Sequence, residues 1–243
     1  MEIINLKYQV SIFGSFDEIV PDGDNIKYFL DEFSDKNLIP NQFSEINVEV
    51  SDENIENKRT SRLRLTNSET TWNVQFFKDR IDFIFTNSDI YVTEMPEIKN
   101  YVEDVKEFIK KINKKYNKSF KRIGLVSQYL VKGIDISESS SKFNTKIGIF
   151  SKKPSIEWTN RNATRINLKD ELINISCDLK WVKTNLIVNS KSQVFEGLLI
   201  NFDTNTIAEN TDYRFNTENI LVFLDEILKI ENELSRDFKL KLS

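Results

Sequence analysis

The residues best suited to catalysis lie between Asp170 and Lys180. Asp178, Leu179 and Lys180 form an Asp-x-Lys pattern on a predicted strand, and Asp170 and Glu171 lie upstream. Because side chains alternate along a strand, Asp178 and Lys180 share a face. A carboxylate followed by such a pair can hold Mg²⁺ and activate water in metal-dependent nucleases. The pattern is short and its upstream acids fall in a predicted turn, so we rank a nuclease behind a binding function.

Other routes to catalysis are limited by the residue types that the chain lacks. It contains no histidine, which excludes a Ser-His-Asp triad, a Cys-His pair and histidine-ligated metals. The single cysteine, Cys177, lies among aliphatic residues, and we interpret it as a small core residue rather than a nucleophile. The segment 203–205 (Asp-Thr-Asn) lacks the glycine and glutamate of a calcium loop and predicts a turn. No glycine-rich phosphate loop is present, so we expect neither a cofactor nor a bound metal.

A second group of polar residues suits binding rather than catalysis. These residues alternate with apolar ones on predicted strands, so they share the face opposite the core. Their guanidinium and amide groups can form hydrogen bonds with a protein or a nucleic acid. The candidate binding residues are Arg62, Arg64, Asn73, Gln75, Arg80, Arg165, Asn167 and Asn174, with Ser176 beside them. An ordinary solvated sheet face is the alternative and accounts for the same pattern.

The elements that position these residues are clearest between Arg62 and Phe85. Three short segments there alternate apolar and polar residues, which predicts antiparallel strands with one apolar face. A polar turn separates the first two strands, and Lys78-Asp79 allows a tight two-residue hairpin loop between the last two. The aromatic-rich apolar face, which includes Trp72 and Phe83, must be covered by another element.

Two amphipathic segments are suited to provide that cover. Apolar residues recur every three or four positions from Pro96 to Tyr116 and from Thr217 to Lys239, which predicts two long helices. The remaining predicted strands cover 6–16, 46–50, 120–134, 146–150, 165–168, 172–182 and 194–202. A short helix is expected from Ile26 to Phe33 and ends by residues 39–41, and the polar segment 51–60 is predicted to be a loop.

The element order suggests two halves of one plan, residues 1–118 and 119–243, packed as one unit. Each half is predicted to contain a strand, a short helix, several antiparallel strands and a long helix. The expected fold class is α+β, a pseudo-duplicated β-α-β(n)-α unit that resembles the saddle of the TATA-binding-protein fold. A single helix-grip sheet wrapped around one helix is the alternative.

Composition limits the function further. Apolar residues make up 39% of the chain and charged residues 30%, which is enough apolar content for a folded core. The net charge is −4, so the molecule as a whole does not attract nucleic acid or an anionic membrane, although a local basic surface remains compatible. No apolar segment is long enough to span a bilayer, and the first residues do not form a signal peptide. We therefore expect a cytoplasmic protein with no membrane partner.

Three segments resemble a sporadically distributed family of uncharacterised bacterial proteins of similar length. They are RIGLVSQYL (122–130), GLLINFDTN (197–205) and the closing RDFKLKL. The resemblance implies a bacterial origin and a role in conflict with phage, and it supplies no catalytic residues. The favoured function is a non-enzymatic binding or assembly subunit with a protein partner or a second copy of itself. The alternatives are a nuclease using Asp178 and Lys180, and a nucleic-acid-binding module.

Overall fold

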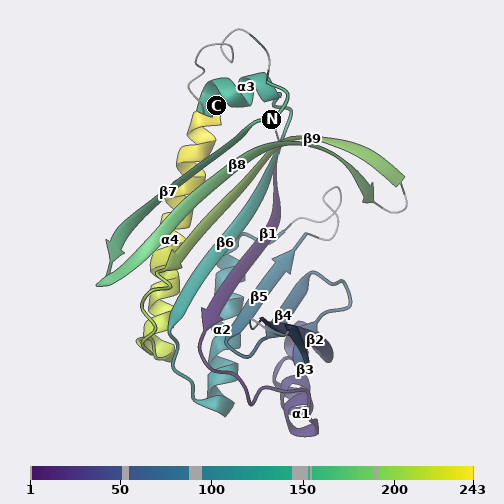
Figure 1. Ribbon diagram of the computed structural model, residues 1–243, viewed down its shortest axis with the longest axis vertical. Helices are drawn as coiled ribbons and strands as arrows, with labels where there is room; N and C mark the ends of the chain where they lie inside the picture. The colour runs from purple at the N-terminus through teal and green to yellow at the C-terminus, as the bar shows by residue number, and fades with distance from the viewer. Residues whose placement is uncertain are drawn as a thin grey trace.

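The computed structural model describes residues 2–50, 55–87, 95–143, 153, 155–188 and 191–242. These residues form one antiparallel sheet of nine strands and four α-helices (Figure 1). The elements are β1 (Glu2–Phe13), α1 (Gly23–Glu32), the 3₁₀ helix η1 (Ser34–Lys36), β2 (Ile39–Val50), β3 (Ile55–Thr66), β4 (Trp72–Phe76), β5 (Arg80–Thr86), α2 (Ile98–Tyr116), β6 (Arg122–Lys132), α3 (Ile136–Phe143), β7 (Thr159–Leu168), β8 (Glu171–Val188), β9 (Lys191–Thr206) and α4 (Thr217–Leu242). The predicted α+β class with an antiparallel sheet is confirmed.

The strands are ordered β2-β3-β4-β5-β1-β6-β9-β8-β7 across the sheet. The central pair is β1 with β6, which stay paired from Glu2↔Lys132 to Phe13↔Arg122. On either side of this pair the strands follow in reverse chain order: β5, β4, β3 and β2 on one side, and β9, β8 and β7 on the other. Residues from both ends of the chain therefore contribute to one continuous sheet.

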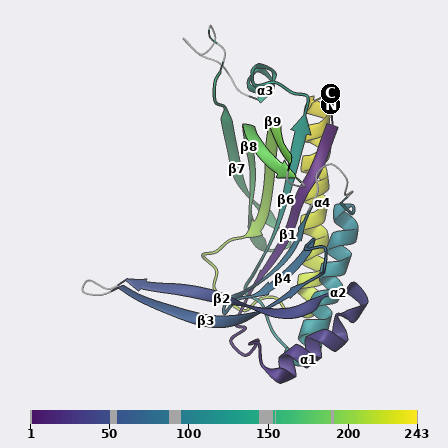
Figure 2. The same ribbon diagram turned by 90° about the vertical axis from the view of Figure 1, so that its right-hand side faces the viewer.

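Helices α2 and α4 lie on the same face of the sheet (Figure 2). The apolar residues of both helices are buried at the predicted three- and four-residue spacing: Tyr101, Val102, Val105, Phe108, Ile109 and Ile112 in α2, and Ile220, Phe223, Leu224, Ile227 and Leu228 in α4. The Tyr101 hydroxyl donates to the carbonyl of Phe83 at 2.6 Å and accepts from the amide of Val10 at 2.7 Å. This buried tyrosine ties α2 to β5 and β1. Within the described residues, no helix combines the length and apolar character needed to cross a bilayer.

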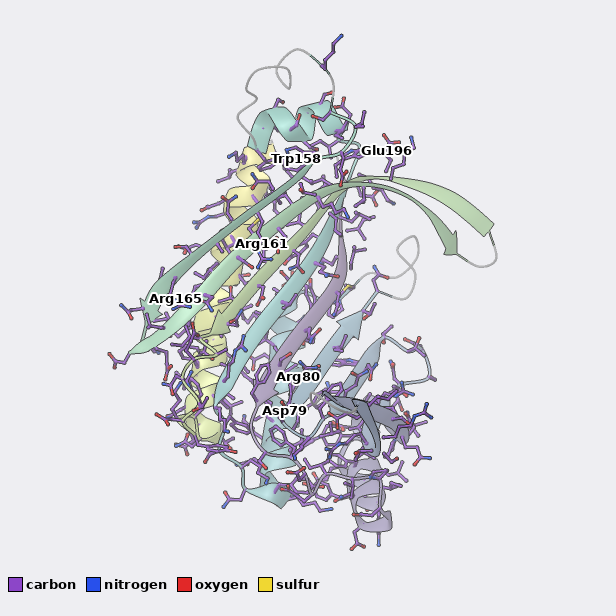
Figure 3. All side chains as sticks on the ribbon, viewed as in Figure 1. Asp79, Arg80, Trp158, Arg161, Arg165 and Glu196 are labelled. Atoms are coloured by element: carbon purple, nitrogen blue, oxygen red, sulfur yellow. The ribbon has the colours of Figure 1, made fainter. Side chains whose placement is uncertain are left out.

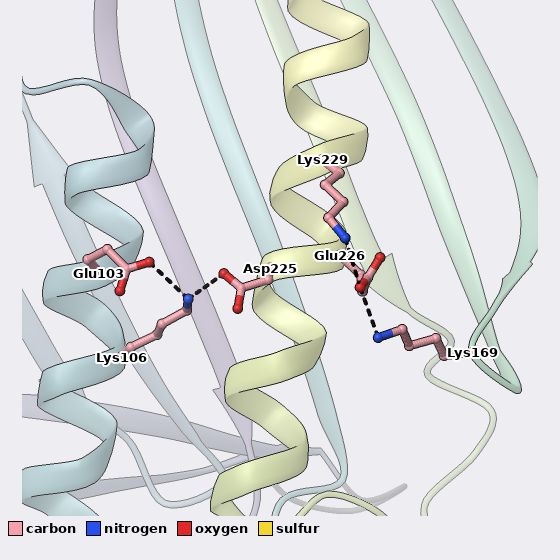
Figure 4. Close-up of polar contacts among 6 residues, drawn as sticks. All are labelled: Glu103, Lys106, Lys169, Asp225, Glu226 and Lys229. Atoms are coloured by element: carbon pink, nitrogen blue, oxygen red, sulfur yellow. Dashed lines mark hydrogen bonds and ion pairs between the residues drawn. The ribbon is translucent and has the colours of Figure 1, made fainter.

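Ion pairs connect α4 to its neighbours on both sides (Figure 4). Lys106 of α2 contacts Glu103 at 2.9 Å and also contacts Asp225 of α4. On the other side of α4, Glu226 lies 2.8 Å from Lys169 in the turn between β7 and β8. The helix is therefore joined both to α2 and to the outer hairpin of the sheet.

The central meander forms as the alternation predicts. Trp72 and Phe83 are buried against the helices, and the two-residue loop closes where Phe77 N–H donates to the carbonyl of Arg80 at 2.8 Å. The hairpin between β7 and β8 also forms, and its turn residues Lys169 and Asp170 have φ values of 46° and 68°. Two consecutive positive φ values match a turn whose twist suits a hairpin.

The interpretation of residues 39–60 is wrong in two places. Residues 39–41 do not follow a helix directly but begin β2, and residues 55–60 belong to β3, which pairs with β2 from Ile39↔Thr66 to Val50↔Ile55. Figure 2 shows this hairpin projecting from the side of the sheet opposite α2 and α4. A strand pair outside the core can be solvated on both faces, so its sequence need not alternate. The predicted strand at 146–150 lies outside the described residues.

Candidate functional site

One residue from each of the nine strands lies on a single row of cross-strand neighbours on the face opposite the helices. The row, which we call the polar row, runs Asn41, Arg64, Gln75, Asp82, Ser11, Gly124, Asn205, Asn174 and Arg165. It brings together four of the predicted binding residues: Arg64 and Gln75 from one side of the sheet, and Asn174 and Arg165 from the other. The sequence predicted the face of each residue, whereas the row depends on the strand order.

Hydrogen bonds hold the two ends of the polar row. Arg64 donates from Nε to Asn41 Oδ1 at 2.7 Å, and Arg165 donates from Nε to Asn174 Oδ1 at 2.8 Å. Near the middle, Gly124 lies so close to β9 that an added Cβ would approach Asn205 Cβ to 3.0 Å. The row is therefore ordered at both ends and has no side chain at Gly124.

Three further predicted residues lie on the same face. Asn73 pairs across the strands with Thr66, Arg80 pairs with Phe13, and Asn167 pairs with Leu172 at the far edge. Ser176, beside Asn174, is largely buried.

Arg62 does not belong to the accessible part of this face, contrary to the prediction. Only 3% of the surface of Arg62 is exposed to solvent. Its Nε lies 2.6 Å from Glu45 Oε2, and a second nitrogen lies 3.8 Å from Asp17. Alternation places Arg62 on the polar face correctly but cannot show that neighbouring acidic side chains cover and neutralise it.

A buried carboxylate lies at the centre of the face and was not among the predicted residues. Asp82 is 3% exposed, accepts a hydrogen bond from Ser11 Oγ at 2.6 Å, and has Arg80 Nε 3.0 Å from its Oδ1. Burial raises the pKa of Asp82, while Ser11 and Arg80 favour its charged form and oppose that shift. In the sequence Asp82 looks like one more polar residue of an alternating strand, so nothing marks it as buried.

Aromatic rings and guanidinium groups alternate along the row next to the polar row. The rings of Phe43 and Phe77 lie 5.3 Å apart, Arg80 lies 4.8 Å from the Phe77 ring and 5.8 Å from the Phe13 ring, and Arg122 lies 4.8 Å from the Phe13 ring. All five side chains are partly exposed. We call this set the Phe–Arg ladder. Its members come from four strands and one turn, so sequence alternation alone does not reveal it.

Two pockets adjoin the ladder and share Arg122. The larger has a volume of about 500 Å³ and is lined by Arg122, Arg161, Ala163, Thr164, Arg165, Asn174, Ser176, Asp203 and Asn205. The smaller, of about 270 Å³, is lined by Phe13, Gly14, Asp79, Lys121, Arg122, Ala208, Asn210 and Thr211. Arg122 is fixed between them, because it donates to Thr206 O at 2.8 Å and to Asn205 Oδ1 at 2.9 Å. Burial lowers the pKa of Arg122. Figure 3 shows Arg161 and Arg165 on the outer strand β7, and Arg80 on β5, on the other side of the central β1–β6 pair.

The candidate nuclease residues lie at the edge of the same face. Asp178 faces Arg161, whose Nε is 3.5 Å from Asp178 Oδ1, and Lys180 is exposed. The upstream acid Glu171 instead lies 2.7 Å from Arg214, and Asp170 lies in the hairpin turn. Within the described residues, no group of three or more acidic or cysteine side chains is arranged to hold a metal ion.

Two other sequence interpretations can be compared with the structure. Residues 203–205 do not form a turn, because they pair along β9 with both neighbours. Cys177 packs against the core as expected, and burial raises the pKa of its thiol to about 11, which keeps it protonated at neutral pH. Trp158 is buried beside Phe143 and covers a core edge.

A second buried carboxyl lies on the opposite side of the sheet. Glu231 of α4 is fully buried and accepts hydrogen bonds from Ser127 Oγ and, at 2.9 Å, from Tyr129 OH. Burial raises the pKa of Glu231. In the sequence Glu231 is one of several charged residues in an amphipathic helix, so its position does not indicate that it is buried.

No protein-family model and no curated protein matches this chain.

Proposed function

We propose that the protein is a non-enzymatic binding or assembly subunit that recognises a partner through the polar face of its sheet. The polar row is the observation that carries this proposal, since it contains amide, hydroxyl and guanidinium groups from seven of the nine strands. Hydrogen-bonding side chains held by a rigid sheet need little reordering when they bind. A protein partner or a second copy of the chain fits this chemistry, and a nucleic acid is the alternative ligand. The bacterial resemblance extends the proposal to a cytoplasmic role in antiviral defence.

We further infer that the fold arose by duplication of a β-α-β(n)-α unit. Each half begins with a strand at the centre of the sheet, and its last strand lies next to that first strand. Each half also places its longer helix last, with 19 residues in α2 and 26 in α4. This order is what the saddle of the TATA-binding-protein fold would require, but a shared fold does not transfer a function.

A site-specific photocrosslinking experiment tests the binding proposal. A photoreactive amino acid would replace Gln75 or Asn174 on the polar face, and matched variants would carry it at Lys110 or Glu107 on the exposed side of α2. We expect crosslinks in cells from the first two positions to one common partner, because both lie on the polar row.

The control positions decide the outcome. Crosslinks only from Lys110 and Glu107 would show that the helical face is the interface. Equal crosslinking from all four positions would show that contacts are non-specific. Either result would remove the proposal.

A metal-dependent nuclease remains the second candidate, because Asp178 and Lys180 share the polar face near the larger pocket. Magnesium-dependent cleavage that disappears in Asp178→Ala would favour it. Glu233→Ala serves as the control, because it removes an exposed carboxylate on α4, away from the polar face.

A further inference from the structure

We propose that the Phe–Arg ladder and the two adjoining pockets bind single-stranded nucleic acid. Bases would stack on the rings and guanidinium groups of the ladder, and phosphates would bind at Arg122, Arg161 and Arg165. This inference rests on the proposed function, since it names the class of ligand that the polar face recognises.

The local charge is opposite in sign to that of the whole chain. The chain has a net charge of −4, whereas the two pockets are lined by four cations and two carboxylates: Lys121, Arg122, Arg161 and Arg165 against Asp79 and Asp203. Six of the nine arginines in the sequence lie on the polar face of the sheet: Arg62, Arg64, Arg80, Arg122, Arg161 and Arg165. Most of the described lysines lie on helices and connecting segments. Arginine binds phosphate in a forked geometry and stacks on aromatic rings, and lysine does neither as well.

Two of the three arginines at the larger pocket, Arg161 and Arg165, can be released to a ligand. Among the residues that the structure describes, Arg161 forms an ion pair only with Asp178, at 3.5 Å, and its side chain is 69% exposed. Arg165 pairs with Glu209 at 3.0 Å, and both side chains are largely exposed. Exposed ion pairs of this kind contribute little stability, so a phosphate can replace the carboxylates at low cost.

The ladder supplies the second requirement, which is a surface for bases. Proteins that bind single strands combine a positively charged path with aromatic side chains on which successive bases stack. Phe13, Phe77 and Phe43 are partly exposed on a sheet face, where rings usually point inward. Arg122 contacts the Phe13 ring and also lines both pockets, so stacking surface and phosphate site are continuous.

The arrangement favours a single strand over a duplex and over an acidic peptide. In a duplex the bases stack on one another and their faces cannot reach the rings. An acidic peptide could pair with the arginines but would leave the ladder without a stacking partner. The amide and hydroxyl groups of Asn174, Asn205 and Thr164 in the larger pocket can form hydrogen bonds with sugars or base edges.

Fluorescence polarisation with labelled oligonucleotides of about 12 nucleotides tests the proposal. The probes are single-stranded DNA, single-stranded RNA, the matching duplex, and an oligo-glutamate competitor. We expect at least one single strand to bind more tightly than the duplex at about 50 mM salt. Oligo-glutamate at equal charge should compete poorly.

Matched variants separate the contribution of the phosphate contacts from that of base stacking. The double variant Arg161→Gln, Arg165→Gln changes two residues of an exposed edge strand. It should weaken binding about tenfold and reduce the slope of log K against log salt concentration by about one for each arginine removed. Phe13→Leu should weaken binding about five- to tenfold and leave the salt dependence unchanged. Arg236→Gln removes one charge from the exposed side of α4 and should have no effect. Thermal melting of each variant confirms folding.

The outcomes distinguish this inference from the proposed function. Equal or tighter binding of the duplex, full competition by oligo-glutamate, or equal loss in Arg236→Gln would overturn the inference. If no oligonucleotide binds but Gln75 and Asn174 crosslink to a protein, the ligand class is wrong and the proposed function stands. If neither position crosslinks and no oligonucleotide binds, both fail.

Discussion

Glu231 shows how strongly one residue can couple stability to pH. Its carboxyl is buried between α4 and β6, and burial raises its pKa above the ordinary value of 4.5. Ser127 and Tyr129 favour the charged form, but burial is the larger effect. The folded chain therefore holds a proton that the unfolded chain releases more easily.

This coupling gives a prediction for Glu231→Gln. Stability from this residue is fully present below about pH 4.5 and is lost as pH rises through the folded-state pKa. The variant should remove that loss and raise the free energy of unfolding near pH 8 by about 1–3 kcal/mol. Urea unfolding from pH 4 to 8 measures it, with the exposed Glu233→Gln as control. If the free energy of unfolding changes with pH in the same way in the wild type and in Glu231→Gln, the pKa of this carboxyl does not differ between the folded and unfolded chains.

Arg62 and Arg64 differ sharply in environment although only one residue separates them. Arg62→Ala leaves Glu45 largely buried without its partner, and we expect a loss of about 3 kcal/mol in the free energy of unfolding. Arg64→Ala removes a partly exposed side chain bonded to Asn41 and should cost less than about 1 kcal/mol. Urea denaturation of both variants tests the difference. Similar losses would mean that the Arg62 ion pair is not the stabilising feature.

At the scale of elements, the contact between α2 and α4 depends on more than apolar burial. Lys106 is largely buried and lies between Glu103 and Asp225 (Figure 4). Its two acidic partners raise the pKa of Lys106 against the opposing effect of burial, which is the largest single influence.

Lys106→Ala should therefore lower the free energy of unfolding by about 1–2 kcal/mol, because it removes both ion pairs and the packing of the side-chain stem. Lys110→Ala, on the exposed side of the same helix, should change it by less than about 0.5 kcal/mol. Thermal and urea unfolding of the two variants provide the comparison. If Lys106→Ala and Lys110→Ala lower the free energy of unfolding equally, the ion pairs of Lys106 between α2 and α4 contribute nothing beyond helix propensity.

Sequence reasoning predicted most reliably the elements that bury one face. The meander, the two amphipathic helices and the face of each candidate residue follow from local periodicity. The polar segment 51–60 does not alternate, so it was interpreted as a loop, although residues 55–60 belong to β3. The polar row, the ladder and the burial of Arg62 and Asp82 depend on which strands are neighbours. That order is set by contacts between distant segments and leaves no local pattern.

At the scale of the whole molecule, the two halves meet along the β1–β6 pair and between α2 and α4. Fragments 1–118 and 119–243 should associate when produced together, because all contacts within each half remain. Each fragment alone should aggregate, since it exposes a strand edge and a helix surface that are paired in the whole chain. Co-purification through a tag on one fragment measures the association. Two fragments that fold separately and do not bind each other would contradict the interface described above.

The sheet has five strands on the β1 side of its centre and four on the β6 side. Its two flanks are therefore not interchangeable: one ends in a projecting hairpin and the other in an exposed arginine-bearing edge. Any ligand with a chemical direction, such as a strand running 5′ to 3′, meets different contacts when it is reversed. For the single strand that we propose as the ligand, the two polarities are therefore not equivalent.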